Sequence, residues 1–209
     1  MDNNELRNSP QNSEKTVKEK TKKQDENILL TYLHDFVFLI TGVLLTFSLL
    51  FRVVVVSGPS MNATLVDGDW LVLLGNVLYT DPQPGDIIVA SKDSFKDGEP
   101  IIKRVIATEG QKVDIDFSKG IVYVDNLPLV EPYTLNPTTR FEGVEFPLVV
   151  EKGCVFVLGD NRDNSKDSRS PDIGQIDCRE ILGKAVFLLM PGNNGGLEER
   201  KLDRIGVVS

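Results

Sequence analysis

The chain has 209 residues, of which 41% are hydrophobic and 26% charged, values typical of one globular domain with room for an appended segment. Its formal net charge of −8 argues against nucleic acid as a partner, because binding phosphates requires a basic surface. Its single histidine, His34, lies far along the chain from every candidate site residue. This excludes a Ser-His-Asp triad, a Cys-His dyad and a histidine-based zinc site there.

Residues 1–35 form a charged N-terminal segment. Residues 1–27 contain almost no apolar side chains and mix both signs of charge. Such a stretch cannot bury enough surface to offset the entropy lost on ordering. We expect it to be disordered or loosely helical.

Residues 36–56, FVFLITGVLLTFSLLFRVVVV, form an apolar run whose only charge is Arg52. A helix of this length reaches about 30 Å, enough to cross the hydrocarbon core of a bilayer. A cleavable signal peptide is disfavoured because the preceding leader is too long, and a buried core helix because every face is apolar. The run therefore predicts a transmembrane helix, although its last valines are β-branched and could already belong to a first strand.

The distribution of basic residues predicts the orientation of this helix. After Arg52 the next basic residue is Lys92, whereas six basic residues precede the run: Arg7, Lys15, Lys18, Lys20, Lys22 and Lys23. Because cytoplasmic flanks carry the excess of Lys and Arg, the N-terminus should be cytoplasmic. Residues 57–209 should then lie outside the cell membrane, in a single-pass topology.

Residues 57–209 have the pattern of a mainly β domain. Short runs of Val, Ile, Leu and Phe alternate with turn signals such as VDGD, DPQPGD and KDGEP, and no long helical period competes with them. We therefore expect one extracytoplasmic β-rich domain. Its two cysteines, Cys154 and Cys178, could form a disulfide there or be two buried small apolar side chains.

Ser60 occupies a glycine-proline corner, SGPSMNATL, directly after the apolar run. Gly58 and Pro59 favour a tight turn that would expose and orient the hydroxyl, as a nucleophile requires. The alternative is a turn serine that satisfies a neighbouring backbone group.

Lys103 lies in PIIKRVIATEG, where strand alternation groups it with Ile101 and Val105 on one face. Burial there would lower the pKa of the amine. A base at neutral pH needs a fall of about 3 units, or roughly 4 kcal/mol. The alternative is an edge-strand lysine whose amine reaches water and discourages aggregation.

The third stretch, VFVLGDNRDNSKDSRS, runs from an apolar strand into a dense polar loop. A calcium loop beginning at Asp160 fails on spacing, because Arg162 stands at its third position and its sixth is not glycine. Asp160 could reach Arg104, while Asp167 and Arg169 lie on one side of an extended segment. A solvated surface loop is the alternative.

In this order after an apolar span, the sequence resembles bacterial type I signal peptidases, the membrane-anchored Ser-Lys proteases that remove signal peptides. The matching blocks are SGPSMNATL (57–65), GDIIV (85–89), KRVIATEG (103–110) and GDNRDNSKDSR (159–169). The resemblance implies a mostly antiparallel, barrel-like β fold with an apolar face near the membrane. It also implies preprotein substrates with small residues at positions −1 and −3, contact with the lipid bilayer, and a monomer.

The resemblance assigns a role to each candidate site residue. Ser60 would be the nucleophile, Lys103 the general base, and Ser165 the hydroxyl that orients the lysine amine. Two ion pairs, Arg104–Asp160 and Asp167–Arg169, would hold the site together. The chain departs from the family pattern at a few positions, with Ala63, Ala107 and Glu109 where proline, glycine and proline are usual, and Gly58 where some relatives place a hydroxyl.

The resulting hypothesis is acyl transfer that requires no metal and no cofactor. A self-cleaving Ser-Lys repressor-type peptidase is a rival, but such proteins are soluble and often carry a DNA-binding domain. A second rival is a catalytically silent, membrane-anchored β domain that binds exported proteins. Cleavage of a peptide ending in Ala-x-Ala would separate that rival from a peptidase.

Overall fold

The computed structural model describes residues 10–92, 95, 98–196 and 199–208. The chain divides into two compact units, Met1–Ser48 and Leu49–Ser209. Residues 1–9 of the predicted charged tail lie outside the described residues.

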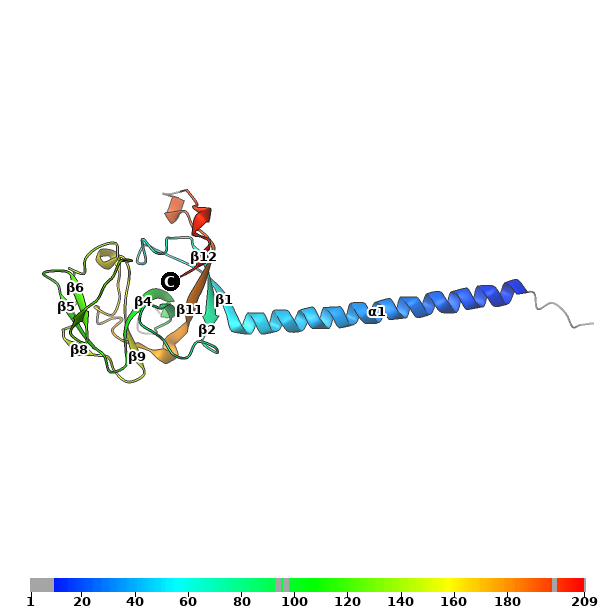
Figure 1. The fold of residues 1–209 in the computed structure, drawn as a ribbon, viewed down its shortest axis with the longest axis horizontal. Coiled ribbons are helices and arrows are strands. Elements are labelled where there is room, and N and C mark those ends of the chain that lie inside the picture. The colour runs from blue at the N-terminus through cyan, green and yellow to red at the C-terminus, as the bar shows by residue number, and fades with distance from the viewer. Residues whose placement is uncertain (1–9, 93–94, 96–97, 197–198, 209) are drawn as a thin grey trace, which may run out of the picture. The chain divides into compact units, whose positions relative to one another are not determined.

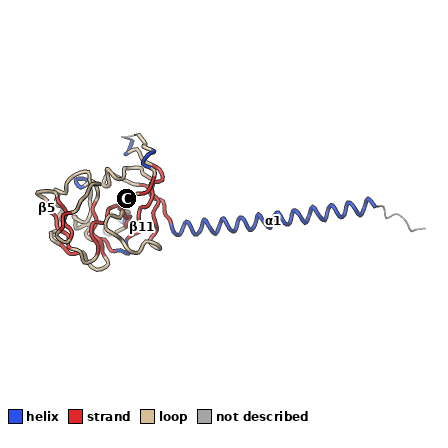
Figure 2. The backbone as a smooth tube through the Cα atoms, in the orientation of Figure 1, coloured by secondary structure: helices blue, strands red, loops and turns tan. Residues whose placement is uncertain are grey.

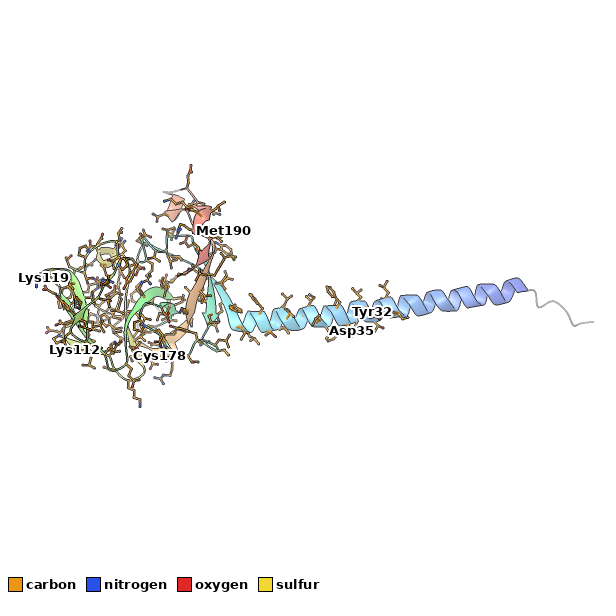
Figure 3. All side chains as sticks on the ribbon, in the orientation of Figure 1. Tyr32, Asp35, Lys112, Lys119, Cys178 and Met190 are labelled. Carbon is orange, nitrogen blue, oxygen red and sulfur yellow. The ribbon has the colours of Figure 1, made fainter. Side chains whose placement is uncertain are left out.

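The first unit consists mainly of one helix, α1 (Pro10–Leu50), shown in Figure 1. Its last 23 residues, Ile28–Leu50, have a mean hydropathy of 2.0 and are long and apolar enough to cross a membrane. The side chains of this segment project from the helix, as Tyr32 does in Figure 3.

The predicted span of 36–56 is displaced toward the C-terminus and is corrected by the structure. The apolar helix ends at Leu50, and β1 (Phe51–Val55) follows it at once. β1 pairs antiparallel with β2 (Trp70–Gly75) from Phe51↔Leu74 to Val55↔Trp70. Val53, Val54 and Val55 therefore belong to the first strand, as their β-branched side chains allow.

The second unit is built on two antiparallel sheets (Figures 1 and 2). Among the described residues the larger, eight-stranded sheet has the order β1-β2-β11-β3-β4-β9-β10, with β12 also paired to β11. Its remaining strands are β3 (Ile87–Ala90), β4 (Ile101–Thr108), β9 (Cys154–Leu158), β10 (Ile176–Asp177), β11 (Ile181–Met190) and β12 (Gly206–Val207). The prediction of a mainly β, antiparallel, barrel-like fold with one N-terminal apolar helix is confirmed.

The smaller sheet has the order β7-β6-β5-β8. Its strands are β5 (Lys112–Asp116), β6 (Ile121–Val124), β7 (Leu127–Pro128) and β8 (Leu148–Val149). Short 3₁₀ turns complete the unit at Arg162–Asn164, Cys178–Glu180, Asn194–Gly196 and Leu202–Arg204.

Alternation along the central strands divides the interior into separate apolar clusters. On β9, Val155 and Val157 join one cluster, while Phe156 and Leu158 point into another that also contains residues of β5 and β6. A third cluster joins β2 and β11 to Met61 and Leu65, the two apolar side chains that follow Ser60. The candidate nucleophile is thus attached to the core by its immediate neighbours.

The two cysteines are free thiols in this structure. Although Cys154 pairs with Asp177, the neighbour of Cys178, the two side chains pack against different clusters. Burial raises the pKa of both thiols. Of the two readings left open by the sequence, the structure matches that of partly buried small apolar side chains.

We predict that Phe156→Ala destabilises the fold by about 3–5 kcal/mol, because the ring is fully buried and stacks edge-on against Phe146 at a centroid distance of 5.8 Å. Urea unfolding of the full chain measures the change. Leu127→Ala is the matched control, since Leu127 is 70% exposed and should cost less than about 1 kcal/mol. Equal effects at the two positions would contradict the assigned core.

Candidate active site

Ser60 lies on a backbone corner that is fixed from both sides. Gly58 adopts φ +86°, a conformation that favours glycine, and its N–H donates to the carboxylate of Asp67 at 2.8 Å. From the polar loop, the Asn161 N–H donates to the Ser60 carbonyl at 3.0 Å, and its side chain donates to the Pro59 carbonyl at 3.1 Å. The segment SGPSMNATL therefore folds into a turn that hydrogen bonds from Asp67 and Asn161 hold in place.

Lys103 projects from β4 toward this corner and is only 4% exposed. Its Nζ donates to Ser60 Oγ at 2.9 Å and to the Ile102 carbonyl at 2.9 Å. Burial lowers the pKa of the amine from about 10.5 to about 8, against the opposing charges of Asp167 and Asp160. The packing of β4 thus removes water from the Lys103 amine, which is one of the two alternatives that the sequence left open.

Ser165 is buried, but it does not make the expected hydrogen bond to the Lys103 amine. Its Oγ has no hydrogen-bond partner among the described residues, and Lys103 donates instead to Ser60 and to a backbone carbonyl. A Cβ added at Gly159 would lie 2.1 Å from Ser165 Oγ and 2.5 Å from the Ser60 carbonyl oxygen. Glycine at 159 therefore allows the polar loop to pack directly against the serine corner.

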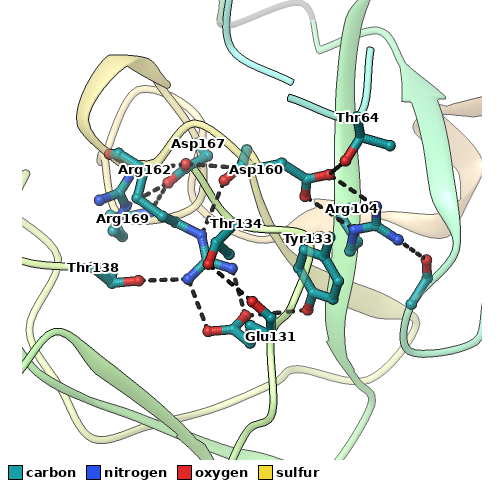
Figure 4. A network of polar contacts seen from close by, with 12 residues as sticks. Thr64, Arg104, Glu131, Tyr133, Thr134, Thr138, Asp160, Arg162, Asp167 and Arg169 are labelled. Atoms are coloured by element: carbon teal, nitrogen blue, oxygen red, sulfur yellow. Dashed lines mark hydrogen bonds and ion pairs between the residues drawn. The ribbon is translucent and has the colours of Figure 1, made fainter. Parts of the chain in front are cut away.

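The side chains of Arg104 and Asp160 form an ion pair that is almost fully buried (Figure 4). Arg104 binds both oxygens of Asp160, at 3.0 and 2.8 Å, and donates to the Gly85 carbonyl at 2.9 Å. Its guanidinium stacks 4.0 Å from the ring centroid of Tyr133. Asp160 also accepts from the Thr64 hydroxyl at 2.5 Å, which links β4, the serine corner and the polar loop.

The Asp167–Arg169 pair stabilises the polar loop from within. Both side chains are fully buried, and the guanidinium binds the two carboxylate oxygens at 2.8 and 2.9 Å. Asp167 also accepts the Gly159 N–H at 3.0 Å, and Arg169 donates to the Arg162 carbonyl at 2.8 Å. The structure thus brings the two residues together, as it does the Arg104–Asp160 pair.

The sequence did not identify the role of Arg162. This side chain is buried and binds both oxygens of Glu131, at 3.0 and 2.5 Å, together with the Thr138 hydroxyl (Figure 4). Tyr133, which covers Arg104, donates to the same carboxylate at 3.1 Å. Glu131 lies 31 residues before Arg162 in a segment without regular pattern, so only the concentration of charge in the polar loop pointed to such a partner.

The departures from the family pattern fit the local structure. Ala107 is fully buried in the cluster shared by β4, β5 and β9. Glu109 accepts the Gly153 N–H at 2.8 Å and so connects two adjacent turns. Neither position changes a group that contacts Ser60 or Lys103.

A groove of about 510 Å³ opens beside the two residues. It is lined by residues 54–61 and 99–103, by Val89, and by Phe95 and Lys166 at one end. Among the described residues, no group of three or more His, Cys, Asp or Glu side chains is arranged to hold a metal ion. The groove can hold an extended chain next to the Ser60 hydroxyl and the buried Lys103 amine.

Comparison with known proteins gives one consistent result. A model of the family described as signal peptidase, peptidase S26, matches residues 29–190. The probable signal peptidase I-1 of Synechocystis is 39% identical over 68% of this chain and 72% of its own, and signal peptidase I T of Bacillus subtilis is 33% identical over 87% and 93%. A crystal structure of a signal peptidase I from Enterococcus faecalis, 30% identical, covers 50% of this chain and 96% of its own with a TM-score of 0.41. The chain belongs to the signal peptidase family, peptidase S26.

Proposed function

We propose that this protein is a single-pass membrane serine endopeptidase that removes signal peptides from secretory preproteins with the dyad Ser60 and Lys103. The observation that carries the proposal is the 2.9 Å contact between Ser60 Oγ and the buried Lys103 amine. Family membership supports the reaction, and the contact supports the choice of residues.

The lowered pKa of Lys103 makes this amine a usable base. At pH 7 a pKa of about 8 leaves about a tenth of the amine neutral, whereas a pKa of about 10.5 leaves about 0.03%. Burial thus increases the reactive fraction by about 300-fold. A base without histidine can then operate near neutral pH.

The reaction follows from this geometry. The neutral Lys103 amine takes the Ser60 proton, and Oγ bonds to the carbonyl carbon of the scissile peptide. Because Gly58 has no side chain, the backbone N–H of Ser60 serves as a donor to the oxyanion. The lysine then protonates the leaving amine, and a water that loses its proton to the same lysine hydrolyses the acyl-enzyme.

The groove suits a segment of a preprotein in extended form. β1 is an edge strand of the larger sheet in the described part of the chain, and its residues 54 and 55 line the groove. An extended peptide can pair with such an edge while its alternate side chains enter the pocket. Alternate residues of such a peptide face the same side, which supports recognition of the residues at positions −1 and −3.

The apolar segment Ile28–Leu50 supports a membrane anchor, with the N-terminus cytoplasmic and the β unit extracytoplasmic. An anchored enzyme meets a membrane-held substrate at a high effective concentration. We propose that it acts as a monomer, because the dyad and both ion pairs come from one chain.

Ser60→Ala, Lys103→Ala and Lys103→Arg should each lower the rate at which a peptide is cleaved after an internal Ala-x-Ala sequence by roughly 10³-fold or more. Alanine removes the nucleophile or the base, and arginine stays protonated. The measurement uses the full chain in lipid, with Lys152→Ala as the control because Lys152 is exposed. A near wild-type rate in any of the first three variants would refute the dyad, and no cleavage by the wild type would favour the silent binding domain.

The pH dependence tests the base separately. Because only the neutral amine accepts a proton and burial lowers its pKa, kcat/KM should rise with pH through a midpoint of about 8 and level off above it. Initial rates between pH 6 and 10.5 measure the midpoint. A midpoint near 10.5, the value of a hydrated lysine, would contradict the assignment.

A further inference from the structure

The C-terminal segment lies beyond the family match, which ends at residue 190. Among its described residues, Leu202–Arg204 forms a 3₁₀ turn and β12 pairs with β11 at Phe187↔Val207 and Leu188↔Gly206. Val208 packs against the apolar cluster that contains Met61 and Leu65. The segment is thus attached to the part of the core that supports the serine corner.

Arg204 connects this segment to the loop that begins at Ser60. Its guanidinium binds both oxygens of Asp69, at 3.0 and 2.7 Å, and donates to the Thr64 carbonyl at 3.1 Å. Asp69 is fully buried, and it also accepts the Val66 N–H at 2.8 Å and the Gly192 N–H at 2.6 Å. The Asp69 carboxylate therefore joins the C-terminal part of the nucleophile loop, Ser60–Asp69, to the C-terminal segment.

The loop passes the constraint on to the dyad. While Arg204 holds the Thr64 carbonyl, the Thr64 hydroxyl donates to Asp160, which binds Arg104 beside Lys103. In the described part of the chain, Arg204 makes no hydrogen bond or ion pair with Ser60 or Lys103, so any effect on them acts through the loop.

The requirement is for a guanidinium rather than for charge alone. A planar fork binds two carboxylate oxygens and still directs an N–H at a third acceptor, whereas an ammonium cannot match all three directions. The Arg204 side chain is only 22% exposed, so water competes weakly for these bonds. Removing it would leave the buried Asp69 carboxylate without its counter-ion.

We propose that Arg204 is a positioning residue that fixes the nucleophile loop and so keeps Ser60 Oγ in contact with the Lys103 amine. The inference rests on the proposed function. The C-terminal segment would then act on catalysis by holding this loop in place. A segment with a purely structural role would lower stability without changing the chemistry of the folded enzyme.

The test compares Arg204→Ala, Arg204→Lys and Arg200→Ala in the full chain in lipid. Arg200 is a matched control, because it lies in the same segment and is exposed. Among the described residues, its hydrogen bond goes to the Met190 sulfur. Arg204→Ala should lower kcat by about 10- to 100-fold with KM changed less than about threefold, since small misplacements of reacting groups are costly. It should also move the kcat/KM midpoint to higher pH, because a loosened loop admits water to Lys103.

Added guanidinium ion should restore part of kcat in Arg204→Ala and none in Arg200→Ala, and Arg204→Lys should lie between the wild type and Arg204→Ala. Thermal melting reports stability in parallel. If Arg204→Ala does not fold, a lowered kcat and raised midpoint in a normally melting Arg204→Lys support the proposal. The proposal is overturned if folded Arg204 variants match Arg200→Ala in kcat and midpoint, whatever their melting temperature.

A second readout separates failure of this inference from failure of the proposed function. Acetylation of Lys103 by acetic anhydride, followed by mass spectrometry, reports the neutral fraction of the amine without any cleavage. A wild type that cuts no peptide contradicts the proposed function, whereas an Arg204→Ala variant whose Lys103 acetylation profile is unchanged contradicts the role of Arg204. An alkaline shift of that profile in Arg204→Ala alone supports it.

Discussion

The 2.9 Å contact between the Lys103 amine and the Ser60 hydroxyl can transfer a proton only while the amine is uncharged. Burial favours that state, but the nearby carboxylates of Asp160 and Asp167 oppose it. Each carboxylate is bound by its own arginine, Arg104 or Arg169, through two short contacts (Figure 4). Of the two arginines, Arg169 also lowers the pKa of Lys103 through its charge, so its ion pair offsets part of the rise that the carboxylates cause.

The same groups also fix the geometry of the contact. Lys103 lies on a central strand, whereas Ser60 lies on a loop whose shape depends on bonds from distant segments. Met61 and Leu65 attach the loop to an apolar cluster, and Asp69 accepts the Val66 N–H near the end of the loop. A regular element therefore carries the proposed base, and an irregular one, held by bonds from several segments, carries the proposed nucleophile.

Local patterns in the sequence predicted the strands, because alternation and turn residues act over a few positions. For Ser60 and Lys103 they left a turn serine and an edge-strand lysine open, and the family resemblance chose between the readings. They misplaced the end of the apolar helix, since hydropathy does not distinguish the last helical turn from a valine-rich strand. Contacts between remote segments do not follow from local pattern, and the Ser60–Lys103 and Arg104–Asp160 contacts were expected from the family resemblance. Arg204 meets Asp69 across 135 positions, and Glu131 and Thr138 gave no pattern that pointed to Arg162. The Ser165 bond to the amine, expected from family resemblance, is not present in this structure, where Lys103 donates to Ser60 and to the Ile102 carbonyl.

The proposed mechanism depends on one property, the ionisation of the Lys103 amine, which can be measured without any substrate. Isotope-labelled lysine followed by NMR across pH 6 to 11, with Lys103→Arg to assign the signal, gives this pKa directly in the full chain. We predict that Lys103 titrates with a midpoint of about 8, well below that of the exposed lysines. A Lys103 signal that titrates near 10.5 with the others would contradict it.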